Sequence, residues 1–345
     1  MKGEHPDRVP LLIFSELLPG NTYQSLIKPA GGGLIVHSGS VHQKRQLVRE
    51  TNDLEAGLRV QRLHTTKGIL RAAYKTNLKS ISGSGEVQVE WFVKERSDYD
   101  AMIEALDDIE FYLDSSQYER TLRMLGNDGV THTWCDEPPY MGLQYLLGYE
   151  AWAMHQYDHP DTFRALLNAY GNMQRKRILL QAHAPEKDLI NLGNLAGNYS
   201  PDAFARYVMP YFEEYGALLR AAGCSVTVHA DALNLSIHKH VFPGRELDVV
   251  EAFTPPPVGD FSLAQARSAW GQDLVYHINI PETLFYSGPD YVYEWTRDLL
   301  VSDSNPRKFL SFTELGFLGV TGEKLQLFTK GMQGLLRAMN DYGRY

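Results

Sequence analysis

The sequence is poor in cysteine: only Cys135 and Cys224 occur among its 345 residues. Two thiols are too few for a disulfide scaffold, or for a thiolate-rich zinc or iron–sulfur site. Any metal bound by this chain must therefore rely on nitrogen and oxygen ligands.

Basic clusters and long apolar runs are scarce as well. The formal net charge is −9, with no basic cluster beyond short stretches such as residues 175–177, which argues against nucleic-acid binding. The polar residues 1–8 lack the apolar core of a signal peptide, and no uncharged run reaches the roughly 18 residues of a membrane span. We therefore expect a cytoplasmic protein with small-molecule or protein partners, and with no nucleic acid or membrane among them.

Hydrophobic residues make up 43% of the chain, enough for a large core. We expect one domain over residues 1–345, because this length suits a single α/β barrel with decorations. Residues 1–129 are richer in short β patterns than the rest. A hairpin is indicated by segments 60–65 and 69–75 around Thr66-Lys67-Gly68, so this part is expected to be a β-rich N-terminal extension integrated with the barrel.

From residue 130 onward, strand and helix patterns alternate. Strands are expected at 130–134, 189–195, 225–229, 247–253, 274–280 and 309–313, and helices at 138–157, 160–183, 200–223, 262–270 and 289–301, followed by a final helix. This alternation is typical of parallel βα units. No glycine fingerprint of a dinucleotide-binding sheet follows an early strand, so the sequence favours a (β/α)₈ TIM barrel.

Polar residues follow the expected strands, where the active site of such a barrel lies. His229 and Asp231 leave one strand two residues apart, so both side chains point the same way and can share a ligand. His277 and Glu314 occupy corresponding places on later strands. Asn194 and Asn279 have two interpretations, because an isolated strand-end asparagine often satisfies a backbone group instead of binding substrate.

Three further residues are candidates for the lining of the barrel mouth. Tyr23 and Phe317 lie in loop-like segments near the expected mouth, although most aromatic residues of such a chain pack in its core. Glu137 follows a strand directly after an acidic neighbour. Together with Asn194 and Asn279, these residues are the expected substrate-binding set.

Four segments, in matching order and spacing, resemble the uroporphyrinogen decarboxylase superfamily. They are Gly3-Glu4-His5-Pro6-Asp7-Arg8-Val9-Pro10, Leu147-Gly148-Tyr149-Glu150 with Asp158-His159-Pro160, Ser200-Pro201-Asp202 leading through Pro210 to Ala222-Gly223, and Val228-His229-Ala230-Asp231. The resemblance covers nearly the whole chain. It implies a (β/α)₈ barrel with a funnel at the carboxyl ends of the strands, and a homodimer, because members of the superfamily are often dimers.

Two activities of this superfamily compete. The decarboxylase branch binds an acidic tetrapyrrole through an arginine-rich N-terminal stretch, but residues 13–23 contain Glu16 and no arginine. The chain is closer to the methyltransferase branch, which moves a methyl group between a small molecule and a corrinoid carried by a partner protein, often with zinc. We therefore expect a methyltransferase that takes a methyl group from a small, methoxylated substrate.

The resemblance also implies a zinc site, from which this sequence departs. The branch uses a His-x-Cys pair and a later cysteine, whereas this chain has Asp231 and Glu314 at those places. A zinc ion would then be held by His229, Asp231 and Glu314, and His277 would assist departure of the leaving oxygen. Alternatively, the site holds no metal and these groups only hydrogen-bond the substrate.

Two other functions stay open: a lyase that decarboxylates a small acid, and a catalytically silent barrel that binds a ligand. The lyase would need a cationic clamp for the carboxylate, and the sequence offers no evident one.

The first testable prediction concerns the tetrapyrrole. Incubation of the purified protein with uroporphyrinogen should yield no coproporphyrinogen, because Glu16 lies where a polycarboxylate substrate needs arginines. Formation of coproporphyrinogen at an enzymatic rate, as measured by chromatography, would overturn this interpretation.

Overall fold

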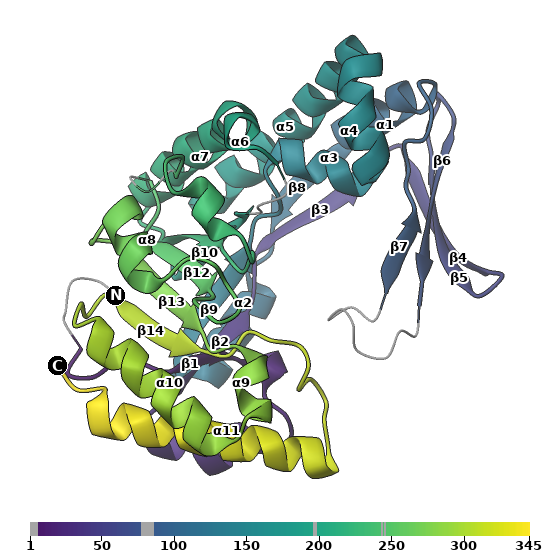
Figure 1. Cartoon of the computed structure of the whole chain (residues 1–345). Coiled ribbons are helices and arrows are strands. Elements are labelled where there is room, and N and C mark those ends of the chain that lie inside the picture. The colour runs from purple at the N-terminus through teal and green to yellow at the C-terminus, as the bar shows by residue number, and fades with distance from the viewer. Residues whose placement is uncertain (1–5, 77–85, 196–198, 243, 245) are drawn as a thin grey trace.

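Eight parallel strands form a barrel in the computed structural model of the chain, which describes residues 6–76, 86–195, 199–242, 244 and 246–345 (Figure 1). Neighbouring strands follow the order β1-β2-β9-β10-β11-β12-β13-β14. A parallel bridge between Leu11 and Leu310 brings the two ends of this sheet together. The predicted (β/α)₈ barrel is confirmed. Its strands are β1 (Leu12–Phe14), β2 (Gly33–His37), β9 (Gly129–Trp134), β10 (Leu189–Asn194), β11 (Val226–His229), β12 (Val249–Phe253), β13 (Val275–Asn279) and β14 (Lys308–Ser311).

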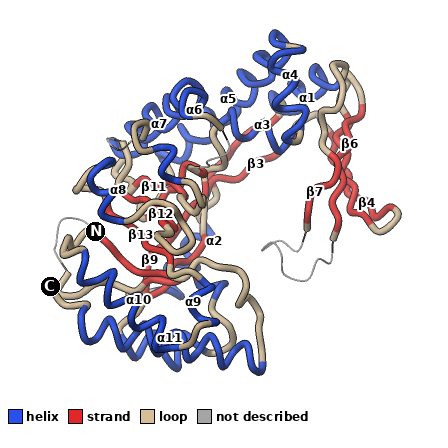
Figure 2. Tube along the Cα trace, viewed as in Figure 1, coloured by secondary structure: helices blue, strands red, loops and turns tan. Residues whose placement is uncertain are grey.

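Helices connect the barrel strands and cover the outside of the barrel (Figure 2). The α-helices are α1 (Asp98–Asp107), α2 (Ser116–Leu125), α3 (Pro139–Leu147), α4 (Tyr149–Asp158), α5 (Pro160–His183), α6 (Pro201–Tyr207), α7 (Met209–Ala221), α8 (Leu263–Trp270), α9 (Glu282–Tyr286), α10 (Pro289–Ser302) and α11 (Gly322–Tyr342). Short helical turns are η1 (Ser15–Leu17), η2 (Tyr23–Ile27), η3 (Lys28–Ala30) and η4 (Leu235–His238). Within the described residues, no helix combines the length and the apolar character needed to span a membrane.

An arm made of the remaining strands is inserted between β2 and β9. β3 (Val41–Arg45) pairs with β8 (Ile109–Leu113), and this ribbon leads to an antiparallel sheet of β4 (Arg49–Glu55), β5 (Leu58–His64), β6 (Ile69–Lys75) and β7 (Val87–Glu90). The predicted hairpin is confirmed as β5 and β6. In Figure 1 the sheet projects away from the barrel, and α1 packs against α5 at its base.

Residues 1–129 therefore contribute both to the barrel and to the arm. β1 and β2 are barrel strands, so the barrel begins well before the point at which the sequence pattern becomes regular. The reason is local: only short turns, η1 to η3, connect β1 to β2, and they carry no long amphipathic period.

Glycine divides one helix that the sequence predicts as continuous. Gly148 has φ +77° and ends α3 before α4 begins, and an added Cβ there would lie 2.8 Å from the ring of Trp91. The long pattern at 138–157 therefore forms two helices.

Ser200 caps α6 as predicted, because its side chain accepts a hydrogen bond from the amide of Ala203. The helix predicted over 200–223 is nevertheless divided into α6 and α7 at Val208, since Pro210 has no amide hydrogen with which to continue the helix.

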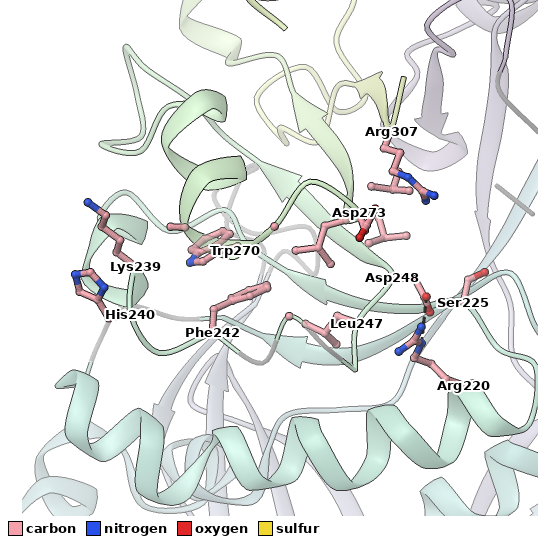
Figure 3. A pocket seen from close by; sticks show the side chains of 16 residues that line it. Arg220, Ser225, Lys239, His240, Phe242, Leu247, Asp248, Trp270, Asp273 and Arg307 are labelled. Carbon is pink, nitrogen blue, oxygen red and sulfur yellow. Dashed lines mark ion pairs between the residues drawn. The ribbon is translucent and has the colours of Figure 1, made fainter. Parts of the chain in front are cut away.

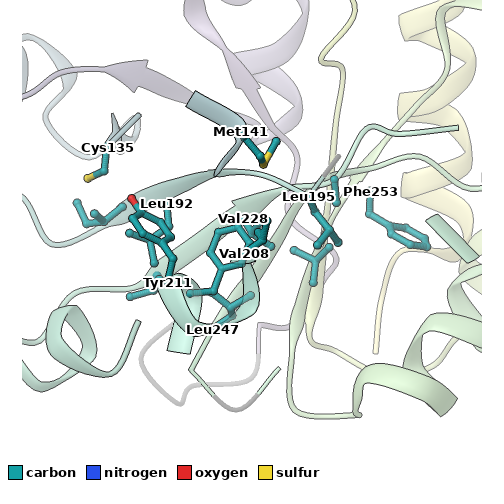
Figure 4. Close-up of a cluster of buried hydrophobic side chains, with 14 of the residues drawn as sticks. Cys135, Met141, Leu192, Leu195, Val208, Tyr211, Val228, Leu247 and Phe253 are labelled. Carbon is teal, nitrogen blue, oxygen red and sulfur yellow. The ribbon is translucent and has the colours of Figure 1, made fainter. Parts of the chain in front are cut away.

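Alternation along the barrel strands separates an outer apolar layer from the barrel interior. Leu192 and Val228 pack outward, against Val208 and Tyr211 of the α6–α7 region (Figure 4). Full burial of such aliphatic side chains contributes roughly 1.5–3 kcal/mol each. Asn191, between Ile190 and Leu192, faces the other way, into the barrel. Its side-chain amide donates a hydrogen bond there to Glu251 of β12.

The start of β9 provides a test of this packing. An added Cβ at Gly129 would overlap the backbone of Leu34 on β2, so Gly129→Ala should lower the free energy of unfolding by about 1–3 kcal/mol. The matched control is Gly171→Ala in α5, whose Cβ would lie 3.8 Å from Pro139 and which should add up to about 1 kcal/mol through helix propensity. Urea unfolding would measure both changes. Equal unfolding midpoints for the two variants would contradict the close packing of Gly129 against Leu34.

Candidate active site

A carboxylate lies buried inside the barrel and organises the side chains around it. Glu251 of β12 accepts hydrogen bonds at Oε2 from His132 Nε2 (2.8 Å), Asn191 Nδ2 (3.0 Å) and Thr227 Oγ1 (3.0 Å). Its Oε1 lies 3.0 Å from His229 Nδ1. Burial alone would raise the pKa of Glu251, but the charges and hydrogen bonds of His132 and His229 hold it well below its ordinary value. Glu251 is therefore an anion in a place that excludes water.

His229 joins this buried anion to the surface. Its Nε2 lies 3.3 Å from Asp231 Oδ2, and the side chain of Asp231 is 63% exposed. Burial disfavours the imidazolium, yet the hydrogen bonds to Asp231 and Glu251 outweigh that effect and raise the pKa of His229 to about 10. The bond from His229 in turn lowers the pKa of Asp231. The structure thus brings His229 and Asp231 together, with His229 protonated at neutral pH.

The network continues on the other side of Glu251. His132 Nδ1 lies 3.0 Å from His37 Nδ1, and His37 Nε2 lies 2.9 Å from Glu16 Oε1. The ring of Phe14 stacks on His37 at 5.0 Å. A continuous chain of polar contacts therefore crosses the barrel, with partly exposed groups at both ends.

Glu137 and Asn194 form a second unit. The carboxylate of Glu137 is buried and accepts hydrogen bonds from the backbone amide of Asn194, at 2.8 Å, and from its side-chain amide. Burial raises the pKa of Glu137 to about 7, against the opposing effect of these bonds. The close approach depends on Gly193, at φ +112°, because an added Cβ would lie 2.9 Å from Glu137 Oε2. Asn194 positions Glu137, which is poised to gain or lose a proton near neutral pH.

Glu314 and Asn279 form a third unit at the ends of β13 and β14. Asn279 Nδ2 donates to Glu314 Oε1 at 2.9 Å and to Thr254 Oγ1 at 3.0 Å, while its Oδ1 accepts from the amide of Thr313 at 3.0 Å. These bonds engage both polar ends of the Asn279 side chain. Burial raises the pKa of Glu314, and the nearby charges of Glu282 and Asp231 add to the effect. Asn279 therefore holds Glu314 and is not itself free to bind a substrate.

The expected role of His277 needs correction. The residue is fully buried, its ring stacks on Phe309 at 4.5 Å, and Phe14 lies 6.0 Å away. Burial lowers the pKa of His277 to about 3, and neither ring nitrogen has a hydrogen-bond partner among the described residues. A histidine that is neutral at physiological pH cannot supply the imidazolium proton expected of it, whereas the pKa of His229 is raised.

Two aromatic residues predicted to line the mouth lie elsewhere. Tyr23, on η2, is close to Asp128 and Lys28, and Asp128 directly precedes β9 at the amino end of the barrel. Phe317 is fully buried in an aromatic cluster with Phe285, Phe312 and Phe328, at ring distances of 5.3–5.8 Å. Packing against the last helix, and not substrate contact, accounts for Phe317.

The residues expected to hold zinc do not fit a three-ligand site. His229 faces a carboxylate at each ring nitrogen, because Nε2 lies 3.3 Å from Asp231 and Nδ1 lies 3.0 Å from Glu251. Glu314 is bound to Asn279. In the described part of the chain, no three His, Cys, Asp or Glu side chains are placed to hold a metal ion.

Sequence reasoning missed the residues that organise the site. Glu251 lies within the apolar segment Val249–Phe253, and His132 lies within the strand Gly129–Trp134. A charged residue inside a buried strand is rare unless it is paired, and that rarity was the available signal.

Comparison with known proteins supports the fold. No family model and no curated protein matches the chain. A methyltransferase from Methanosarcina mazei is similar in structure, with a TM-score of 0.51 and 11% identity over 77% of this chain and 76% of that chain. A B12-independent methionine synthase from Shewanella sp. W3-18-1, solved with selenomethionine, gives a TM-score of 0.44 and 10% identity over 91% of this chain and 83% of that one. At such identities the first likeness shows a shared fold alone, and the second carries no argument.

The charge of Glu251 generates a prediction about its neighbour. Glu251→Gln keeps the size of the side chain but removes the anion, so the pKa of His229 should fall from about 10 towards the ordinary histidine value. Titration of the imidazole signals by NMR, with the signal assigned through His229→Gln, would measure the shift.

The control is Glu16→Gln, at the far end of the same network. Glu16 reaches His229 only through His37, His132 and Glu251, so the pKa of His229 should stay near its wild-type value in this variant. An unchanged pKa in Glu251→Gln would show that the buried carboxylate does not hold the proton on His229.

Proposed function

We propose that this protein is a methyltransferase that takes the methyl group of a small methoxylated aromatic compound, with a corrinoid on a partner protein as the acceptor. The observation that carries the proposal is the position of His229, held between buried Glu251 and exposed Asp231 at the carboxyl end of the barrel. A positioned imidazolium at the mouth of a (β/α)₈ barrel is suited to general acid catalysis.

The reaction needs a proton at the leaving oxygen. As the bond between the methyl carbon and oxygen breaks, its electron pair stays on the oxygen, which takes the proton from His229 Nε2 and leaves as a phenol. A phenol has a pKa of about 10, and the pKa of His229 is also about 10. This match lets the proton pass to the oxygen as charge develops there, without a large uphill transfer.

Asp231 and Glu251 have different roles in this step. Glu251 lies 3.0 Å from Nδ1 and is fixed by three other donors, so it orients the ring and stabilises its positive charge. Asp231 contacts Nε2 at 3.3 Å and is largely exposed, so its side chain can yield that nitrogen to a substrate oxygen. Glu251 is a positioning residue, and His229 is the group that touches the reacting atoms.

When bound at the mouth, a corrinoid supplies the nucleophile that takes the methyl group. The mouth suits an acceptor delivered by another protein, because Asp231 is 63% exposed and the donor nitrogen of His229 points towards it. No step of this proposal requires zinc.

The nature of the surrounding groups favours methyl transfer over decarboxylation of a small acid. Asp231, whose pKa is lowered by its bond to His229, is a carboxylate anion beside that imidazole, and its negative charge opposes a carboxylate substrate. The methyltransferase from Methanosarcina mazei with the same barrel fold adds support by analogy.

The proposal predicts a large loss in His229→Gln. With 2-methoxyphenol and a reduced corrinoid protein, formation of catechol should fall by about 10²–10⁴ in kcat, since the general acid is lost. The rate of the wild type should decline as pH rises through about 10, where His229 loses its proton.

The matched control is His183→Gln, an exposed histidine in the last turn of α5, which should keep the wild-type rate. Equal rates for His229→Gln and His183→Gln would remove His229 from the mechanism. Absence of methyl transfer from methoxylated aromatic compounds by the wild type would contradict the proposed function.

A further inference from the structure

A second site candidate lies at the opposite end of the barrel. A cavity of about 830 Å³ opens beside residues that directly precede the barrel strands: Ser225 before β11, Asp248 before β12, Leu274 before β13 and Arg307 before β14 (Figure 3). Its size is that of pockets for small organic ligands. The groups proposed for methyl transfer lie at the other, carboxyl ends of these strands, so the cavity is not part of that site.

The charges that line this cavity favour an anion, although the whole chain carries −9. Arg220 lies 3.2 Å from Asp248, which also accepts a hydrogen bond from the amide of Val226, so this carboxylate is already engaged. Arg307 and Lys239 line the cavity as well, and among the described residues neither forms an ion pair. Asp273 is the remaining carboxylate of the lining.

Two flat aromatic side chains line the middle of the cavity. Phe242 stacks on Trp270 with ring centroids 4.3 Å apart and an interplanar angle of 11°, and both residues line the cavity. Stacked aromatic side chains provide a surface for a planar ring and, at a given position, tolerate many ring types.

The order of these groups along the cavity is informative. In Figure 3, Phe242 and Trp270 lie in the middle, Asp273 comes next, and Arg307, Ser225 and Arg220 lie beyond it. Aromatic surface, carboxylate and guanidinium groups are the partners of a base, of sugar hydroxyls and of phosphates, respectively.

We propose that this cavity binds a mononucleotide, with its ring against Phe242, its ribose hydroxyls near Asp273 and its phosphates at Arg307 and Ser225. The proposal is independent of the methyl-transfer proposal, because the two involve opposite ends of the barrel.

Calorimetric titration of the full chain with ADP, pyrophosphate and adenosine tests this site. ADP should bind with one site per chain and at least tenfold more tightly than pyrophosphate or adenosine, since only ADP engages both the aromatic and the cationic parts. Absence of ADP binding at millimolar concentration, or equal affinity for ADP and either fragment, would overturn the proposal.

Matched variants locate the binding. Arg307→Ala should weaken ADP binding at least tenfold, whereas Arg49→Ala, an exposed arginine of the arm, should change it less than twofold. Phe242→Ala should weaken ADP and leave pyrophosphate unchanged. Because the side chain of Arg307 is exposed, its removal should leave the fold intact. Equal ADP affinity in Arg307→Ala and Arg49→Ala would refute the site, and unaltered ADP binding in His229→Gln would separate this result from the methyl-transfer proposal.

Discussion

The burial of one carboxylate, Glu251, is the constraint on which the barrel interior depends. Moving a carboxylate out of water costs several kcal/mol even after the protein relaxes, so it must be met by donors. Four side chains from three neighbouring strands supply them: His132, Asn191, Thr227 and His229. The middle of the barrel is therefore polar, and a separate apolar cluster with Phe14, Ile35, Leu189, Val249 and Phe309 packs apart from the main core.

The same constraint explains why His229 is protonated although it is partly buried. A single exposed carboxylate, Asp231, would compete with water for the imidazolium. Glu251 acts through a medium of lower dielectric and is held in place by other donors, so its attraction adds to the hydrogen bond from Asp231. The charge of His229 thus depends on a carboxylate inside the barrel as well as on one at its mouth.

Sequence patterns predicted the overall architecture of this structure but only the outer part of the candidate active site. Apolar periodicity and strand-end position are local properties, and they were sufficient for the barrel, the arm hairpin and the pair His229 and Asp231. The roles of Glu251 and His132 depend on contacts across 119 residues of sequence, which no local pattern encodes. Phe317 and Tyr23 were misplaced for a related reason, because an aromatic residue in a loop can turn equally well towards a core or a pocket. Burial, in turn, decided the protonation of His277.

Glu251 also constrains strand pairing. In the parallel register, His229 of β11 lies opposite Glu251, and Thr227 opposite Val249. A slip by one residue would turn Glu251 outward, among the apolar side chains that pack between strands and helices, and would separate it from all four donors. An unpaired carboxylate there would cost several kcal/mol, more than any single apolar contact of the strand could return. The polar layer that holds the proton on His229 therefore also selects the register in which the barrel closes.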